Sequence, residues 1–243
     1  MDQSTFAIRR ITDFVSAHVT PRSTILDVGA GRGAVARELG QLGFEVTAID
    51  PSPKSVELAK ANGVKVLQAP VGTFVADSTF DVALLSMVAH HIHPLGLSLD
   101  KTRDLMRPKG QILIEDFAVE DADVPSAAWH YQTLAAMKAV GLFDCGDRDL
   151  LEALEDPLTA WWEEHSDDHH PFNTGTAMLE AVKERFEVES VERVPYFYRY
   201  IAAACAERSG VGDFSEALFE IEERLIRAGR IKALGLRIVA VRA

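Results

Sequence analysis

The feature that most constrains this chain is the alternation, over its first half, of short apolar segments with longer segments of helical periodicity. One apolar segment, FDVALLS, is almost continuous, as expected of a central parallel strand that is covered on both faces. Strands that alternate with helices predict a doubly wound, mostly parallel α/β sheet. The predicted strands are 24–28, 44–50, 64–68, 80–86 and 111–117, and the helices between them are 34–43, 51–63 and 97–106.

The chain becomes mainly helical after the fifth predicted strand. We expect a single domain over 1–243, with a helical lid inserted at 118–170. Tyr196, Tyr198 and Tyr200 alternate along the chain, which predicts a strand with the three rings on one face. The other elements predicted beyond the lid are a helix at 171–186, a strand at 186–194, a helix at 213–229 and a final strand at 234–243.

The composition limits the partners and the location of the protein. With 25 basic and 37 acidic residues the net charge is −12, which argues against a broad nucleic-acid-binding surface, because such surfaces neutralise phosphates with Lys and Arg. No apolar run approaches the ~20 residues of a membrane helix, and the first residues lack the apolar stretch of a signal peptide. The 2 cysteines cannot form a disulfide framework. We therefore expect a soluble, cytoplasmic protein without a membrane partner.

A glycine-rich turn, DVGAGRG at 27–33, follows the first predicted strand. Ligands of open parallel sheets bind beyond the carboxyl ends of the strands. Glycines let the backbone approach a ligand, and the following helix offers free N–H groups to a carboxylate or phosphate. Asp50 ends the second strand, 21 residues after Gly29, where a carboxylate accepts both hydroxyls of a ribose. The alternatives are an ordinary tight turn for the glycines and a helix N-cap for Asp50.

The spacing of the glycines distinguishes among nucleotide cofactors. The dinucleotide fingerprint is G-x-G-x-x-G, whereas this chain has G-x-G-x-G, with Asp27 two residues before Gly29. The carboxylate of Asp27 would repel a pyrophosphate and attract an ammonium group. An NAD-dependent oxidoreductase of the short-chain type is also disfavoured, because no Tyr-x-x-x-Lys pair occurs in the sequence.

Four sequence motifs follow one another along the first half of the chain. They are ILDVGAGRG (25–33), VTAIDPSPKSVELAKANG (46–63), FDVALLSMVAHHI (80–92) and LMRPKGQILIEDF (105–117). In this order they resemble the class I S-adenosylmethionine-dependent methyltransferases. The resemblance implies a Rossmann-like sheet of seven mostly parallel strands, whose antiparallel seventh strand is the segment 234–243. It also implies S-adenosyl-L-methionine as the cofactor.

The resemblance assigns roles to residues at matching positions. Asp27 and the backbone of Gly29 and Gly31 would hold the methionine end of the cofactor. Asp50 would hold the ribose.

The resemblance also places parts of the cofactor site at the ends of the third and fourth strands. Ser86 and Met87 would approach the methionine and the reactive methyl group. Many relatives carry an acidic residue after the third strand that binds the adenine amino group, but this chain has Ala-Pro-Val there. Adenine is therefore expected to be bound by Gln68 or by the backbone at Ala69.

Three histidines, His90, His91 and His93, follow the fourth strand, beside the expected position of the methyl group. An acceptor hydroxyl or carboxyl requires a base that works near neutral pH, and histidine is the usual choice. We expect His91 or His90 to be this catalytic base, with His91 preferred; the alternative is that the histidines only shape the turn. Asp116, which ends the fifth strand, is a predicted substrate contact or second base.

In the predicted lid, Trp161 and His165 are expected to contact the acceptor, because aromatic side chains suit the wall of an apolar pocket. The alternative is that these aromatics form the core of the lid. His165 and His169 are four residues apart, which also suggests a metal site. No cysteine lies nearby and the ligand set is loose, so we expect no metal.

These observations predict methyl transfer from S-adenosyl-L-methionine to an O, N or C nucleophile of a small-molecule acceptor. The acidic composition and the lack of an RNA-binding appendage favour a small acceptor over the alternative of a protein or RNA methyltransferase. A second alternative is a non-catalytic partner protein that keeps the cofactor for stability. The sequence leaves the acceptor and the oligomeric state open.

Overall fold

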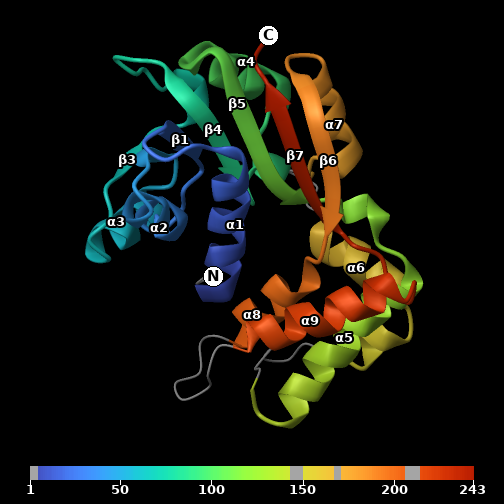
Figure 1. The fold of residues 1–243 in the computed structure, drawn as a ribbon. Coiled ribbons are helices and arrows are strands. Elements are labelled where there is room, and N and C mark those ends of the chain that lie inside the picture. Colours follow the sequence, from blue (N-terminus) through green and yellow to red (C-terminus); the bar gives the residue numbers. More distant parts are fainter. Residues whose placement is uncertain (1–4, 143–149, 167–170, 206–213) are drawn as a thin grey trace. The chain divides into compact units, whose positions relative to one another are not determined.

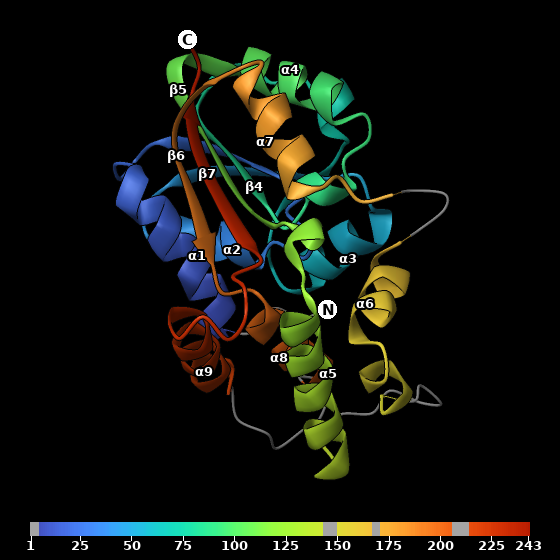
Figure 2. The ribbon, with the colours of Figure 1, turned by 90° about the vertical axis from the view of Figure 1, so that its right-hand side faces the viewer.

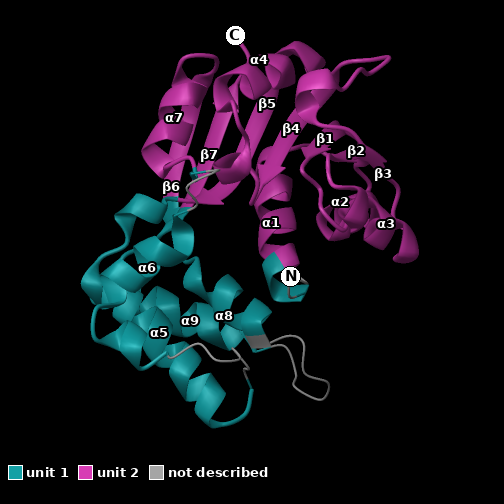
Figure 3. Ribbon diagram, turned by 180° about the vertical axis from the view of Figure 1, so that it is seen from behind, with its two compact units in different colours: residues 1–7, 118–172, 193–235 teal, residues 8–117, 173–192, 236–243 magenta. Residues whose placement is uncertain are grey.

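The computed structural model describes residues 5–142, 150–166, 171–205 and 214–243, and the chain forms two compact units (Figure 3). The sheet unit comprises Ile8–Phe117, Asn173–Glu192 and Leu236–Ala243, and the helical unit comprises Met1–Ala7, Ala118–Phe172 and Arg193–Gly235. The segment 118–170, which was expected to form a lid, belongs to the helical unit. Its action as a lid stays a prediction.

The described part of the sheet unit is organised around a seven-stranded sheet (Figure 1). Its strands are β1 (Thr24–Val28), β2 (Glu45–Asp50), β3 (Val66–Gln68), β4 (Phe80–Ser86), β5 (Met106–Phe117), β6 (Glu187–Val194) and β7 (Gly235–Val241). They lie in the order β3-β2-β1-β4-β5-β7-β6. The predicted strands 24–28 and 80–86 have the predicted bounds, because each is an apolar run between turn residues. β1 pairs in parallel with β2 and β4, β2 with β3, and β4 with β5.

β7 runs antiparallel to β5. Near the start of β5, Lys109 N donates to Arg242 O (3.1 Å) and Arg242 N donates to Gly110 O (2.9 Å). At the other end, Ala118 N donates to Leu234 O (2.8 Å). The predicted doubly wound sheet of seven mostly parallel strands, with an antiparallel seventh strand, is therefore confirmed.

Helices cover both faces of the sheet. They are α1 (Thr5–His18), α2 (Ala34–Gln41), α3 (Pro53–Ala61), α4 (Leu95–Leu105) and α7 (Gly175–Lys183), with short 3₁₀ turns η1 (Val71–Thr73) and η2 (Ala89–His91). Alternate residues of a strand face opposite sides. In β4, Val82 and Leu84 join the core with α1 and α2, whereas Ala83 and Leu85 join the core with α4 and α7. Figure 2 shows α1 and α7 on opposite sides of the sheet.

The helical unit is held together by aromatic side chains. Its elements are η3 (Val119–Asp121), α5 (Val124–Ala139), η4 (Glu152–Leu154), α6 (Pro157–His165), α8 (Phe197–Cys205) and α9 (Ser215–Arg227). Trp161 and Phe197 are fully buried with ring centroids 5.4 Å apart, and Trp161 Nε1 donates to Val119 O (3.2 Å). Asp123 and Asp156 cap the amino-terminal ends of α5 and α6. No helix in the described residues is long and apolar enough to cross a membrane.

The strand predicted from the alternating tyrosines is wrong, because these residues enter helix α8. The carboxylate of Glu222 on α9 accepts the backbone N–H groups of the three residues Tyr196 (2.6 Å), Phe197 (3.0 Å) and Tyr198 (2.8 Å). This carboxylate satisfies donors that a helix amino terminus otherwise leaves free. Phe197 and Ile201, four residues apart, are both fully buried, so the helical period decides the structure.

A buried ion pair joins β5 and β7. Oε2 of Glu115 lies 2.7 Å from Nε and 2.6 Å from Nη2 of Arg237, and the two residues are 2% and 9% exposed. The same guanidinium donates to Arg10 O (3.1 Å) and lies 4.7 Å from the ring centroid of Phe14, both on α1. One buried cation therefore connects α1, β5 and β7.

We expect Arg237→Ala to lower the free energy of unfolding by about 3–5 kcal/mol, because the carboxylate of Glu115 stays buried without its counter-charge. The control Arg227→Ala removes an exposed ion pair with Glu223 on α9 and should cost less than about 1 kcal/mol. Urea unfolding of both variants at neutral pH measures the difference. Equal small losses in the two variants would contradict the structural importance of the buried pair.

Candidate functional site

The carboxyl ends of the parallel strands meet at one edge of the sheet. Asp27 of β1 lies opposite Ala48 of β2 and Leu84 of β4, and Ser86 lies opposite Glu115. The predicted cofactor residues at or just beyond this edge are Asp27, Gly29, Gly31, Asp50, Gln68, Ala69, Ser86 and Met87. The structure therefore gathers side chains from four strand ends, as parallel pairing requires.

The glycine-rich turn is folded back against the end of β2. Gly29 N and Ala30 N donate to Ile49 O (2.9 and 3.0 Å), and Gly31 N donates to Oδ2 of Asp50 (2.8 Å). Gly29 has a φ of 71°, and a Cβ atom there would overlap the side chain of Val88. Only glycine fits at this position, so the turn exposes backbone at the edge of the sheet.

The carboxylate of Asp50 fixes this turn to β2. Besides Gly31 N, it accepts a hydrogen bond from Ser52 N to Oδ1 (2.8 Å), and the residue is 7% exposed. The N-cap alternative for Asp50 is wrong, because Ser52 caps α3 by accepting from Ser55 N. Each carboxylate oxygen has a second lone pair, so Asp50 has acceptor capacity left for a ligand.

Asp27 is buried without a full set of partners. It is 2% exposed, and its Oδ2 has no hydrogen-bond partner within the described residues. Burial, and secondly the charge of Asp50, raise the pKa of Asp27 to about 7. A buried carboxylate that lacks a counter-charge is costly, and a cationic ligand group would remove the cost. The chemistry of this residue therefore fits the ammonium group of an amino-acid tail.

Ser86 and Met87 lie on the neighbouring strand end. Oγ of Ser86 is also buried without a partner in the described part of the chain. Met87 has a φ of 57°, in the left-handed region that costs energy for a residue with a Cβ, and its N donates to Glu115 O (2.8 Å). The end of β4 thus adds a second unsatisfied polar atom and a strained backbone to the same edge.

The end of β3 offers little to hold a purine. Gln68 is exposed, and Ala69 is half-buried with its N donating to Asp50 O (3.1 Å). Pro70 has no N–H to donate. Contacts of Gln68 and Ala69 with adenine stay a prediction.

His90 and Asp116 form a buried pair between η2 and the end of β5. Nδ1 of His90 lies 2.6 Å from Oδ1 of Asp116, and the residues are 5% and 0% exposed. Asp116 also accepts from the backbone N of His90 (3.2 Å) and of Phe117 (2.9 Å). A carboxylate that holds one ring nitrogen fixes the tautomer and the orientation of an imidazole.

His91 differs from its neighbour. It is exposed, and its ring centroid lies 4.0 Å from that of His90. Its pKa is lowered to about 4, first by loss of hydration where the ring packs, then by His90 and His93, against the opposing effect of Asp116. His91 is therefore neutral at pH 7 but a weak base.

Asn173, which was not predicted from the sequence, holds the turn η2, which contains His90 and His91. Its Nδ2 donates to Ala89 O (2.9 Å) and Ile92 O (2.8 Å), and its backbone N donates to His90 O (2.9 Å). The only sequence signal is an asparagine just before Thr174, the N-cap of α7, which indicates a turn and not a site.

Trp161 and His165 belong to the helical unit and are buried in its aromatic core. Their rings stack at 3.8 Å, and His165 bonds through Nδ1 to Trp161 O (2.8 Å) and through Nε2 to Tyr200 Oη (3.3 Å). These contacts support the core alternative for both residues. A contact with the acceptor stays a prediction.

The described residues contain no cluster of three His, Cys, Asp or Glu side chains that could hold a metal. His169, which entered the metal alternative, lies outside the described residues.

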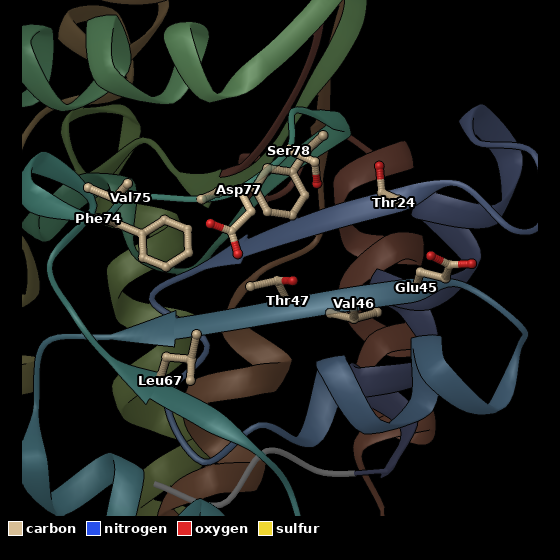
Figure 4. A pocket seen from close by; sticks show the side chains of 11 residues that line it. Thr24, Glu45, Val46, Thr47, Leu67, Phe74, Val75, Asp77 and Ser78 are labelled. Carbon is tan, nitrogen blue, oxygen red and sulfur yellow. The ribbon is translucent and has the colours of Figure 1, made fainter.

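A separate hollow of about 470 Å³ lies toward the other ends of the strands (Figure 4). Thr24, Glu45 and Phe80, the first residues of β1, β2 and β4, line it. The segment from Phe74 to Ser78 crosses over the sheet there. None of the predicted site residues line this hollow, so it is distinct from the edge described above.

Comparisons with known proteins agree on the fold. A family model described as "Methyltransferase domain" matches residues 3–191. The ubiquinone biosynthesis O-methyltransferase of Rickettsia akari is 31% identical over 115 residues, which cover 45% of this chain and 45% of that protein. The chain thus matches less than half the length of this relative.

Two solved structures resemble the whole chain at low sequence identity. One is the 1,6-didemethyltoxoflavin N1-methyltransferase of Burkholderia thailandensis with S-adenosylhomocysteine bound, with a TM-score of 0.55 and 20% identity over 97% of this chain and 78% of that one. The other is the [4+2]-cyclase SpnF, with a TM-score of 0.60 and 18% identity over 99% of this chain and 83% of that one.

The buried carboxylate of Asp27 generates a prediction for the protein without ligand. Its pKa of about 7 lies above the ordinary 3.8, so between these values the folded chain keeps a proton that the unfolded chain has released. Stability therefore falls as the pH rises through this range. Relative to Asp27→Asn, the wild type should lose about 2 kcal/mol of unfolding free energy between about pH 5 and pH 7.

Urea unfolding at a series of pH values measures this loss. Glu222, whose pKa burial also raises to about 7, titrates in both proteins and cancels in the comparison. The exposed Asp104 provides the control, since Asp104→Asn should follow the wild-type curve. Parallel curves for the wild type and Asp27→Asn would contradict the raised pKa.

Proposed function

We propose a methyl-transfer function for this chain, which belongs to the methyltransferase domain family and to the class I S-adenosylmethionine-dependent methyltransferases. In this proposal the protein is an enzyme that methylates a small-molecule acceptor. The observation that carries the proposal is the sheet edge at which the buried, partly unpartnered carboxylate of Asp27 lies next to Asp50 and a half-buried glycine turn.

The residues at this edge suit the parts of S-adenosylmethionine. Asp27 would pair with the α-ammonium group, because that cation stabilises the buried carboxylate. Asp50 would accept the ribose hydroxyls with its remaining lone pairs while it holds Gly31. Ser86 Oγ would gain a hydrogen-bond partner in the methionine end of the cofactor. When bound, the cofactor supplies a methyl group on a positively charged sulfur.

The adenine subsite differs from that of many relatives. Ala-Pro-Val, without a carboxylate, follows β3 directly, so the purine would be held by Gln68 and by apolar contact at Ala69. Shape and burial would therefore contribute more to purine binding than recognition of the amino group.

Three observations support a small molecule as the acceptor. The relative from Rickettsia akari is named a ubiquinone biosynthesis O-methyltransferase, and the Burkholderia methyltransferase structure holds bound 1,6-didemethyltoxoflavin. The net charge of −12 disfavours RNA. We place the reaction in the cytoplasm, where the 2 cysteines would stay reduced.

The assigned ribose contact is tested by calorimetry with S-adenosylhomocysteine. Asp50→Ala should raise the dissociation constant by about 10- to 100-fold, because two hydrogen bonds to a charged acceptor are lost. Asp104→Ala, on the exposed face of α4, is the matched control and should bind as the wild type does. Unchanged binding in Asp50→Ala would overturn the contact.

The activity is tested by measuring release of S-adenosylhomocysteine with a panel of small phenols, amines and carboxylic acids, a histone peptide mixture and a transfer RNA. We expect turnover with at least one small molecule and none with the peptides or RNA. Tight cofactor binding without turnover on any member would instead indicate the non-catalytic alternative. Turnover on peptide or RNA alone would replace the small acceptor by a macromolecule.

A further inference from the structure

We propose that His90 is the general base of the reaction, that Asp116 and Asn173 position it, and that the acceptor therefore carries its nucleophile as a hydroxyl group. The inference rests on the proposed methyl transfer and adds the acceptor class and two positioning residues to it.

Asp116 controls the imidazole of His90. Its carboxylate binds both Nδ1 (2.6 Å) and the backbone N (3.2 Å) of His90, so ring and backbone are held by one group. With Nδ1–H donated to the carboxylate, the neutral imidazole carries its lone pair on Nε2, and a neighbouring negative charge stabilises the imidazolium that proton uptake creates. The ring of Phe117, 4.9 Å away and edge-on, limits rotation further.

Asn173 controls the backbone on the other side of His90. Its side chain bridges the carbonyls of Ala89 (2.9 Å) and Ile92 (2.8 Å), the residues that flank the two histidines, and its backbone N donates to the carbonyl of His90 (2.9 Å). Three hydrogen bonds from one residue hold a turn that follows the strained Met87. Such fixed placement is what a proton acceptor requires, because small displacements of a catalytic group cost large factors in rate.

His91 differs from His90 in its surroundings, because it is exposed, whereas His90 is 5% exposed. The lowered pKa of His91, about 4, also makes it a poor proton acceptor. The geometry thus favours His90 over the preference for His91 that the sequence alone suggested.

A base held in this way indicates the kind of acceptor. A thiolate or carboxylate attacks without losing a proton, and a neutral amine has its lone pair available before attack, whereas a hydroxyl gains nucleophilicity as its proton leaves. In the proposed step the hydroxyl proton passes to Nε2 of His90 as the oxygen bonds to the methyl carbon. The sulfur–methyl bond breaks with its electron pair staying on sulfur, and His90 later gives its proton to water.

The kinetic test uses a matched set of acceptors, a phenol with its aniline and thiophenol analogues. We expect the wild type to methylate the phenol. His90→Gln should lower kcat for the phenol by about 10²-fold or more with little change in KM. Asp116→Asn should lower kcat by a similar factor, and Asn173→Ala by about tenfold. His18→Gln on α1 is the control for a histidine elsewhere and should match the wild type.

A spectroscopic test reads the same geometry without turnover. In ¹⁵N-labelled protein the neutral imidazole of His90 should show protonated Nδ1 and unprotonated Nε2. Asp116→Asn should shift the population toward the other tautomer, whereas His18→Gln should leave the His90 signals unchanged. Calorimetry with S-adenosylhomocysteine on every variant shows whether the fold and the cofactor site are intact.

The outcomes separate the two proposals. These outcomes are read only for variants that bind S-adenosylhomocysteine normally. If His90→Gln keeps its activity, or if His91→Gln loses more activity than His90→Gln, then His90 is not the base. If only the aniline or thiophenol is methylated, the hydroxyl assignment is wrong while methyl transfer stands. If the wild type binds no S-adenosylhomocysteine and methylates nothing, the proposed function itself fails.

Discussion

The burial of Asp27 beside a second buried carboxylate, Asp50, is the constraint on which the site depends. Parallel pairing of β1 with β2 brings both residues to the same sheet edge, and Asp50 adds to the raised pKa of Asp27. The carboxylate of Asp50 is stabilised by hydrogen bonds from the backbone N–H groups of Gly31 and Ser52. In contrast, Oδ2 of Asp27 lacks a hydrogen-bond partner in the described residues. The protein therefore folds with an electrostatic cost that a bound cation would remove, which couples stability to ligand binding.

Whether a feature could be predicted from the sequence depends on how local its cause is. The strand 80–86 is an apolar run between turn residues, and the glycine turn is fixed by its own backbone, so both were predicted with their residues. Helix α8 was missed because its first N–H groups are satisfied by Glu222, which lies on another helix. Asn173 was missed for the same reason: its partners lie more than eighty residues earlier in the chain.

The fold leaves the reaction open, and the side chains at the sheet edge must decide it. Solved structures that share the fold include an N-methyltransferase and a [4+2]-cyclase. Because one fold serves different chemistry, the acceptor has to be inferred from the groups that face the reacting atoms. We propose that in this chain those groups follow β4, where a strained Met87 leads into the turn that Asn173 and Asp116 hold.

The end of β5 shows how stability and chemistry are kept apart. Adjacent residues of a strand face opposite sides of the sheet, so Glu115 and Asp116 enter different surroundings. Glu115 pairs with Arg237 on the face covered by α1, where the carboxylate and the guanidinium compensate each other. Asp116 faces the α7 side and holds His90. Of these two adjacent acidic residues, Glu115 thus anchors the sheet and Asp116 orients the imidazole of His90. The strained Met87 also depends on this strand end, because its N–H is bound by the carbonyl of Glu115.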